Sequence, residues 1–385
     1  MTDSTDNARA WLRLLRAGIG AAALRKQAVA CGSAIAALDA STAQWREVGA
    51  DADAIAALAK PDASLLAADA AWLDAPNHHL IGWDSPDYPA LLRRIGSPPP
   101  ALLVAGDPDL LWHPQIALVG SRHATAGGLD NAAAFAGALA RAGLVITSGL
   151  AEGVDAASHL AALDAGRPTI AVVGTGPDVA YPRRHLGLTR RIVAEGAVVS
   201  EFLPGTQARR EHFPRRNRII AGLALGTLVI EAAERSGALI TARLAGESGR
   251  EVFAVPGSIH NPLARGCHRL IRQGAALVED ASEVIEPLAS LAAELASALR
   301  ARLELPTGHG ALAGRDLRAG PHDPRPEDPD YAQLLDALGH DPVGIDRLAE
   351  RTGLTVTALS SMLLLMEMDG RVTAEHGRYA QRKSL

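Results

Sequence analysis

The sequence predicts an α/β protein whose core is a Rossmann-like, mostly parallel sheet, with a small helical domain before the core and a winged-helix domain after it. Three observations support this fold class. The chain has 385 residues, which is too long for one domain of ordinary size. Short apolar runs alternate with helical patterns from residue 115 to about residue 300. A stretch rich in Gly, Pro and charge at residues 301–329 is then expected to be a flexible linker to the last domain.

The first region, residues 1–75, reads as short helices rich in Ala and Leu with glycines between them. The turn Leu15-Arg-Ala-Gly-Ile-Gly20, followed by a helical run, is typical of a helix-hairpin-helix or SAM-like module, whose backbone N–H groups can point at a phosphate. The pattern is short and common, so a packing domain is the preferred interpretation and a DNA contact is the alternative. Residues 76–114, which contain three consecutive prolines, are expected to be a connector.

The core, residues 115–300, combines apolar runs that resemble buried strands with helical segments that join them. The expected strands are Ile116–Gly120, Leu144–Ser148, Thr169–Gly174, Ala197–Phe202, Thr227–Glu231, Glu251–Pro256 and Ala275–Val278. The expected helices include Leu129–Ala142, Val154–Ala165, Arg218–Leu225 and Leu239–Ser248. Such a pattern indicates a parallel sheet covered on both faces. Ligands of these sheets bind at the carboxyl ends of the strands, where turns containing Gly120, Gly149 and Gly174 are expected to converge.

These turns and one basic stretch form a candidate site for single-stranded nucleic acid. The stretch Phe213-Pro-Arg-Arg-Asn-Arg-Ile-Ile-Ala-Gly222 is expected in a loop that enters a helix. Arginine forks match phosphate oxygens, an aromatic ring can stack on an unpaired base, and N–H groups at a glycine turn can hold a phosphate. The candidate DNA-binding residues are Gly120, Ser121, Arg122, Ser148, Gly149, Arg209, Arg210, Phe213, Arg216, Asn217 and Arg218. A second basic cluster, at residues 183–191, is explained equally well by a solvated helix face.

Composition limits the other function classes. The net charge is −5, and lysine occurs only at positions 26, 60 and 383, so arginine must make nearly all cationic contacts. The two cysteines are far apart, which argues against a disulfide framework or a structural zinc site. No membrane span and no signal-peptide core are evident, so the cytoplasm is the expected location. No P-loop, dinucleotide fingerprint, nucleophile elbow or zinc-protease motif occurs, so no cofactor, metal or enzymatic activity is expected.

Residues 330–385 are predicted to form the winged helix. Three helical patterns are followed by a β-like tail from Arg371, and the patterns are Tyr331–Leu338, Gly344–Thr352 and Thr357–Met368. The second and third helices of such a domain form a helix-turn-helix, which reads DNA or recruits protein. The third pattern is rich in Met and Leu and contains no Arg, which favours protein contact or packing over DNA reading.

Motifs between about Tyr88 and Val278 resemble those of the DNA processing protein A family, also called DprA or Smf. The matching motifs are Val119-Gly-Ser-Arg122, Ser148-Gly-Leu-Ala-Glu-Gly-Val-Asp155, Phe213-Pro-Arg-Arg-Asn-Arg-Ile-Ile220, Glu231-Ala-Ala-Glu-Arg-Ser-Gly237, Thr241-Ala242, Val255-Pro-Gly257, Asn261-Pro262 and Leu270-Ile-Arg-Gln-Gly-Ala275. Together they are far more specific than a single glycine turn. One departure is His268, where many relatives have Asn.

The resemblance implies a homodimer, formed through the Rossmann-like core, that binds incoming single-stranded DNA during natural transformation. It also implies that the protein protects this DNA and helps to load the RecA recombinase. The resemblance places the family's DNA-contacting residues at Gly120, Ser121 and Arg122, at Arg209 or Arg210, and at Phe213, Arg216, Asn217 and Arg218. Two alternatives remain. A Rossmann-type nucleotide hydrolase would need a carboxylate such as Glu152 or Glu201, and a transcriptional regulator would act through the winged helix.

Overall fold

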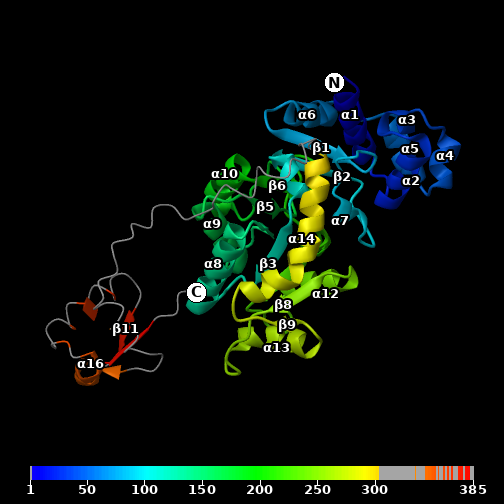
Figure 1. Ribbon diagram of the computed structural model, residues 1–385. Coiled ribbons are helices and arrows are strands. Elements are labelled where there is room, and N and C mark those ends of the chain that lie inside the picture. Colours follow the sequence, from blue (N-terminus) through cyan, green and yellow to red (C-terminus); the bar gives the residue numbers. More distant parts are fainter. Residues whose placement is uncertain are drawn as a thin grey trace. The chain divides into compact units, whose positions relative to one another are not determined.

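A computed structural model of the chain describes residues 2–302 and, further on, residues 334, 343–352, 354, 359, 362, 363, 366, 372–375 and 378–381. The chain divides into two compact units, Met1–Leu305 and Pro306–Leu385 (Figure 1). Each unit has its own hydrophobic core. Of the predicted linker 301–329, the first two residues end a helix and residues 303–329 lie outside the described residues. No helix in the described part of the chain is long and apolar enough to cross a membrane.

The first unit begins with the predicted set of short helices. They are α1 (Thr2–Arg16), α2 (Ala21–Cys31), α3 (Ala34–Leu38), α4 (Thr42–Glu47), α5 (Ala52–Ala59) and α6 (Ala63–Leu73). Side chains of Ser33, Ser41, Asp51 and Asp62 accept hydrogen bonds from the first free N–H groups of α3 to α6, so each of these short helices starts at a defined residue. Trp11 and Trp45 are fully buried in the core that these helices share.

A sheet of nine strands follows, in the order β1-β2-β6-β5-β4-β3-β7-β8-β9. The strands are β1 (His78–Gly82), β2 (Ala101–Gly106), β3 (Gln115–Gly120), β4 (Val145–Ser148), β5 (Thr169–Val172), β6 (Ala197–Ser200), β7 (Gly226–Ile230), β8 (Glu251–Ala254) and β9 (Ala276–Leu277). Strands β3 to β9 pair in parallel, whereas β1 pairs with β2 and β2 with β6 in the antiparallel sense. The predicted Rossmann-like, mostly parallel sheet is therefore confirmed.

The sheet starts earlier than the sequence suggested. Residues 76–114, expected to be a connector, supply β1, β2 and α7 (Ala90–Arg93). The three prolines end just before Ala101, where the chain enters β2, and every residue of β2 is buried. The prolines thus lie before the strand and not in it, which leaves the N–H groups of β2 free to pair with β1 on one side and β6 on the other.

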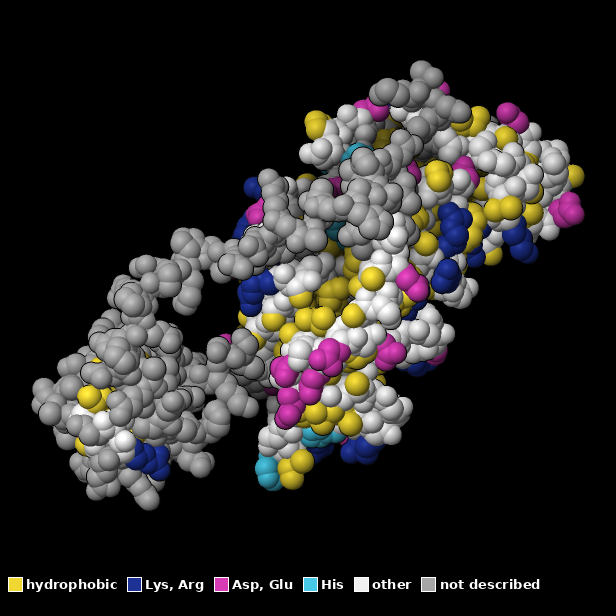
Figure 2. Space-filling model, in the orientation of Figure 1, with side chains coloured by type: hydrophobic (Ala, Val, Ile, Leu, Met, Phe, Trp, Pro, Cys, Tyr) yellow, Lys and Arg dark blue, Asp and Glu magenta, His cyan; other side chains and the backbone are white. Residues whose placement is uncertain are grey.

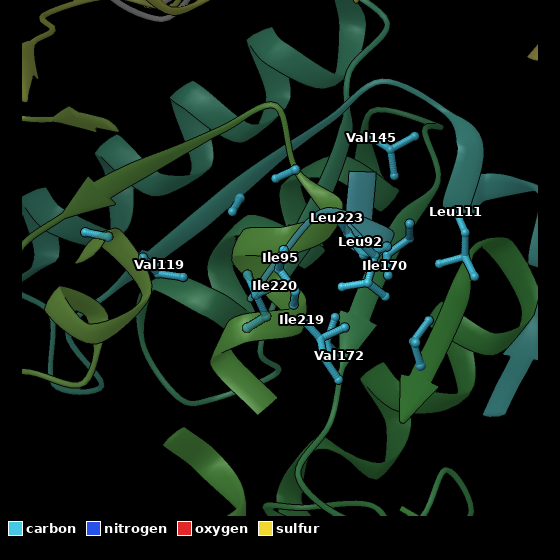
Figure 3. Close-up of a cluster of buried hydrophobic side chains, with 14 of the residues drawn as sticks. Leu92, Ile95, Leu111, Val119, Val145, Ile170, Val172, Ile219, Ile220 and Leu223 are labelled. Atoms are coloured by element: carbon cyan, nitrogen blue, oxygen red, sulfur yellow. The ribbon is translucent and has the colours of Figure 1, made fainter. Parts of the chain in front are cut away.

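Helices cover both faces of the sheet. On one face, Leu92 of α7 packs with apolar residues of α11 (His212–Leu223), α12 (Ala238–Glu247) and α13 (Arg265–Arg272), as Figure 3 shows for part of this cluster. On the other face lie α8 (Ala126–Arg141), α9 (Val154–Asp164) and α14 (Ser282–Arg302), which is the long helix in the foreground of Figure 1. Helix α10 (Leu186–Glu195) packs beside β5 and β6.

Helix α11 begins at His212, six residues before the predicted start at Arg218. Phe213, Arg216 and Asn217, which were expected in a loop, therefore lie in its first two turns. Pro214 is compatible with this position because the first turn of a helix has no hydrogen-bonded N–H groups to lose. Side chains that the sequence placed on one flexible loop are thus distributed around a helix.

The negative charge of the chain is unevenly distributed. Figure 2 shows acidic side chains gathered where α14 begins, and the exposed residues there are Glu279, Asp280, Glu283 and Glu286. This face is unfavourable for a polyanion such as DNA, because like charges repel.

The second unit contains the expected wing. Helix α16 (Ile345–Thr352) coincides with the second predicted helical pattern, and β10 (Val343–Gly344), β11 (Val372–Glu375) and β12 (Arg378–Gln381) form an antiparallel sheet in the order β10-β12-β11. Its core includes Leu348, Leu363 and Met366. The other two predicted patterns fall largely outside the described residues, although Leu334, Leu359, Met362, Leu363 and Met366 are helical.

Candidate nucleic-acid interface

A pocket of about 720 Å³ lies at the carboxyl ends of β3 and β7. It is lined by the Gly120–His123 turn after β3, by the first half of α11, by residues 233 and 235–238 after β7, and by Tyr181. The strand ends of a parallel sheet meet at one edge, so turns that are distant in sequence converge there. The structure thus brings together the Gly-Ser-Arg turn and the Phe213 segment.

The turn after β3 is rigid and presents one exposed charge. A Cβ atom at Gly120 would lie 2.0 Å from the backbone oxygen of Ile230, so this position has room only for glycine. Ser121 is buried, and its hydroxyl accepts a hydrogen bond of 3.1 Å from the N–H group of His123. Arg122 is exposed and has no ion-pair partner among the described residues. The turn therefore positions a free guanidinium at the pocket.

Arg122 lies beside the aromatic side chain that the sequence singled out. Its guanidinium carbon is 5.6 Å from the ring centroid of Phe213, which is a cation–π distance. Phe213 is half-buried and lines the pocket. The pairing of a cation with an aromatic ring is the arrangement expected where a phosphate and a base are bound together.

Arg216 differs from its prediction. It was expected to reach phosphate from the rim, but only 5% of it is exposed and it lies at the floor of the pocket. Its guanidinium donates to the backbone carbonyl oxygens of Gly149 and Val172 and to Oδ1 of Asn217. Burial lowers the pKa of Arg216 to about 10, although nearby Asp155 opposes this effect. Its hydrogen bonds therefore tie α11 to the ends of β4 and β5.

Ser148 and Gly149 also differ from their predicted role as phosphate ligands. Ser148 is buried, and its hydroxyl donates to the backbone oxygen of Leu118 at 2.6 Å. The N–H group of Gly149 donates to Oδ2 of Asp155 at 3.1 Å. Both donors are thus used inside the protein, and the N–H group of Gly149 helps to hold Asp155 in place.

Asn217 is buried and links two elements of the pocket. Its Oδ1 accepts from Arg216 at 3.1 Å, and its Nδ2 donates to the backbone oxygen of Gly237 at 3.4 Å. Asn217 therefore connects α11 to the turn before α12.

Arg218 is not part of the pocket. Its guanidinium is paired with Glu201, whose side chain is 3% exposed, and Arg215 lies 3.4 Å from the same carboxylate oxygen. Burial lowers the pKa of Arg218, and the charge of Glu201 opposes this shift. This pairing also neutralises one of the two carboxylates considered for a hydrolase, and the other, Glu152, is paired with Arg184.

The remaining predicted residues are Arg209 and Arg210, and the structure separates them. Both are exposed, but only Arg210 lines the pocket. The pocket also contains Arg235 and Tyr181, which the sequence analysis did not select. Arg122 was found because it lies in a glycine turn at the carboxyl end of a strand. Arg235 lies in such a turn too, Glu-Arg-Ser-Gly after β7, so the same criterion could have found it. The exposed cations of the pocket are thus Arg122, Arg210 and Arg235.

Of the described residues that line this pocket, Asp155 is the one with a carboxylate. It is buried and accepts hydrogen bonds from the N–H groups of Gly149 and Ala151 at 3.1 and 3.3 Å. Burial raises its pKa, and the charge of Arg216 opposes the rise. Within the described residues there is no group of His, Cys, Asp and Glu side chains that could hold a metal ion.

Comparison with known proteins places the chain among recombination mediators. Residues 79–289 match the family described as DNA recombination-mediator protein A, and residues 318–378 match the DprA winged helix domain. Protein Smf of Escherichia coli K12 is 40% identical over 311 residues, which is 80% of this chain and 79% of that protein.

Two solved structures are similar to this chain. The X-ray structure of DNA processing protein A from Streptococcus pneumoniae has 37% sequence identity and a TM-score of 0.66, covering 72% of this chain and 96% of that one. The DprA structure from Helicobacter pylori, described for its single-stranded DNA binding mode, has 26% identity and a TM-score of 0.50, covering 55% of this chain and 96% of that one.

Proposed function

Because the chain belongs to the DNA recombination-mediator protein A family, also called DprA or Smf, we propose that it binds single-stranded DNA and mediates homologous recombination. The observation that carries this proposal is the pocket at the sheet edge, which is lined by the exposed residues Arg122, Arg210 and Arg235 and by the rings of Phe213 and Tyr181. Support also comes from the Helicobacter pylori relative, which is described as binding single-stranded DNA.

The chemistry of the pocket favours a single strand over a duplex. Arginine side chains neutralise phosphates and aromatic rings stack on bases, but the bases of a duplex are already stacked and unavailable. In this proposal Arg122 and Arg210 contact phosphate, and Arg235 is a third candidate, because all three are exposed and line the pocket. Arg216 and Arg218 have structural roles in this proposal, because their guanidinium groups are engaged with protein groups.

The proposed cellular role is that of the family. The protein protects single-stranded DNA that enters the cell during natural transformation, and in the cytoplasm it helps to load the RecA recombinase onto this DNA. It acts as a homodimer, which places two pockets on one strand and raises the effective affinity.

The pocket supports binding rather than catalysis. Hydrolysis would require a carboxylate that is free to act on a substrate or a water molecule. Asp155 accepts two backbone hydrogen bonds and lies beside Arg216, while Glu152 and Glu201 are paired with arginines. These carboxylates therefore have protein partners that fit a structural role.

Fluorescence anisotropy across a salt series tests the proposal, with labelled poly-dT and a duplex of the same length as ligands. We expect wild type to prefer the single strand and Arg122→Ala to bind it more weakly. The salt slope, which is the slope of the logarithm of the binding constant against the logarithm of the salt concentration, should be smaller in magnitude by about 0.7 for Arg122→Ala, because one phosphate contact is lost. Arg191→Ala is the matched control, because Arg191 is also exposed but is paired with Asp164 and Glu195. Equal binding by wild type and Arg122→Ala would contradict the proposed site.

A further inference from the structure

We infer that the pocket continues into a second nucleotide subsite at its mouth, where Tyr181 stacks on a base and Arg183 contacts the adjoining phosphate. The inference rests on the proposed function and extends it, since neither residue belongs to the Gly-Ser-Arg turn or to the Phe213 segment. It also gives a role to part of the basic cluster at residues 183–191, which the pocket itself does not explain.

The first argument is the exposure of the two rings. Tyr181 lines the pocket and is 46% exposed, which is unusual for a large aromatic side chain in this protein. Its ring centroid lies 5.4 Å from that of Phe213, with the planes tilted by 40°. Phe213 is half-buried and is already in contact with Arg122 as well as with Tyr181. Of the two rings, Tyr181 is therefore the one that offers more free surface to an incoming base.

The second argument is that the loop carrying Tyr181 is held rigidly. The N–H group of Gly176 donates to the backbone oxygen of Thr206 at 2.9 Å, and the hydroxyl of Thr175 donates to that of Val179 at 2.7 Å. The carboxylate of Asp178 accepts the N–H group of Gly205 through both oxygens, at 2.9 and 3.0 Å. A ring on such a support is already in place before the strand binds, so little entropy is lost on binding.

Close packing adds to this rigidity. A Cβ atom at Gly176 would lie 2.6 Å from the backbone oxygen of Leu203 and equally close to Oδ1 of Asp178. The loop after β5 and the loop after β6 therefore pack tightly against each other, and neither can shift without moving its neighbour.

The third argument is the charge next to the ring. The short helix η2 (Arg183–His185) begins two residues after Tyr181, and it is fixed to the core by a 3.0 Å contact between Nδ1 of His185 and the backbone oxygen of Leu150. Arg184 and Arg191 in the same cluster are each paired with a carboxylate. Arg183 is exposed and has no ion-pair partner among the described residues.

An exposed ring followed by a free guanidinium matches one nucleotide, with a base for the ring and a phosphate for the charge. Every base has a π-face, so the subsite should accept any base and should not read sequence. The strand would leave the pocket over Tyr181 towards η2. A strand that fills only the pocket should therefore not depend on Tyr181, whereas a longer strand should.

The test measures affinity for oligo-dT of increasing length in the full-length protein. For strands long enough to reach the mouth, Tyr181→Ala should lose about 5- to 150-fold in affinity, the range for one lost stacking contact, and Tyr181→Phe should bind like wild type. Arg183→Gln should reduce the salt slope by about 0.7, and the control Arg191→Gln should leave it unchanged. Circular dichroism checks that each variant is folded.

Photocrosslinking provides a second readout that does not depend on a variant. Oligo-dT carrying a single 5-iodo-deoxyuridine should crosslink to the peptide containing Tyr181 when the label lies at one end position of the bound strand. If wild type binds and Arg122→Ala binds weakly, but Tyr181→Ala binds like wild type and no crosslink forms at Tyr181, the subsite is wrong and the proposed function stands. If wild type does not bind single-stranded DNA, both are wrong.

Discussion

The guanidinium of Arg216 fills the space beside Gly149, where a Cβ atom on the glycine would lie 2.5 Å from the nearest guanidinium nitrogen. The same guanidinium donates to the carbonyl oxygen of Gly149, while the N–H group of that glycine donates to Asp155. The peptide groups around Gly149 thus lie between a buried cation and a buried carboxylate. This contact fixes the floor of the pocket. Glycine is present after β4 because a larger residue would collide with Arg216, and its N–H group is used by Asp155 and not by a ligand.

Substitution of Gly149 should therefore lower the stability of the fold. In Gly149→Ala the new methyl group displaces the guanidinium of Arg216, and its hydrogen bonds to backbone oxygens weaken, at a cost of about 1.5–3 kcal/mol. Gly187→Ala on α10 is the control, because an added Cβ there meets no atom within 4 Å. Urea unfolding monitored by circular dichroism measures both variants. Equal midpoints for Gly149→Ala and wild type would show that Arg216 can move freely.

Arg216 and Arg122 should separate stability from binding. Arg216→Met leaves two carbonyl oxygens without their donor and removes the positive charge near the buried Asp155, so the free energy of unfolding should fall by about 3–5 kcal/mol. Arg122→Ala should change it by less than about 0.5 kcal/mol, because Arg122 is exposed, yet it should weaken single-stranded DNA binding. Thermal unfolding and anisotropy are measured on the same samples. A stable Arg216→Met protein that fails to bind DNA would instead assign Arg216 to phosphate.

How far the sequence predicted this structure can be judged from particular elements. The parallel strands from β3 onward are continuous apolar runs between turn residues, and all seven were predicted close to their observed bounds. Strands β1 and β2 were missed, because the run Ala101–Gly106 follows directly after prolines and only the short helix α7 lies between the two strands, without the long helical pattern that joins parallel strands. The location of the site was predictable, because the carboxyl ends of parallel strands share one edge.

The roles of individual arginines were not predictable in the same way. Placing residues 213–217 in a loop that enters a helix at Arg218 gave all of these side chains equal access to solvent. As part of α11 they follow a helical period, so Arg216 faces the core while Arg215 and Arg218 reach Glu201. Which face of the helix is buried depends on the sheet beneath it, and this information is not local to the segment.

The difference between Arg218 and Arg210 gives a direct test of this reassignment. Arg218 is paired with Glu201 outside the pocket, whereas Arg210 is exposed and lines it. Arg210→Ala should therefore reduce the salt slope of poly-dT binding by about 0.7, and Arg218→Ala should leave the slope unchanged in protein shown to be folded. A reduced slope for Arg218→Ala alone would restore the prediction made from the sequence.

His159 should make stability depend on pH. It is fully buried, and its Nδ1 lies 2.7 Å from the hydroxyl oxygen of Thr169, which itself donates to a backbone oxygen, so Nδ1 carries the hydrogen. Nε2 has no partner in the described part of the chain, and burial lowers the pKa from 6.5 to about 3.

The sign follows from this lowered pKa. Between pH 6.5 and about 3 the unfolded chain binds a proton at His159 that the folded protein does not. Stability is therefore complete above pH 6.5 and falls below it, by up to about 1.4 kcal/mol per pH unit. Urea unfolding from pH 8 to pH 5 should show a shallower dependence in His159→Asn, which keeps a donor near the Nδ1 position. Parallel curves for the two proteins would mean that the folded protein also protonates His159.

Arg16 connects the N-terminal helices to the loop that carries Arg209 and Arg210. Its guanidinium makes two hydrogen bonds of 2.6 Å to Asp69, whose side chain is fully buried, and a third of 3.1 Å to the backbone oxygen of Pro204. Arg16→Met should lower the free energy of unfolding by about 3–5 kcal/mol, because it leaves the Asp69 carboxylate buried without its partner.

Arg9 is the matched control for Arg16, since it lies on the same helix and pairs with Asp74, but both of these side chains are about half exposed. Exposed ion pairs contribute little, so Arg9→Met should change stability by less than about 1 kcal/mol. Arg16→Met should also weaken poly-dT binding in protein that is still folded, because the loop before α11 loses its contact with α1. If Arg16→Met and Arg9→Met unfold at the same urea concentration and bind poly-dT equally, the N-terminal helices do not support the DNA-binding loop.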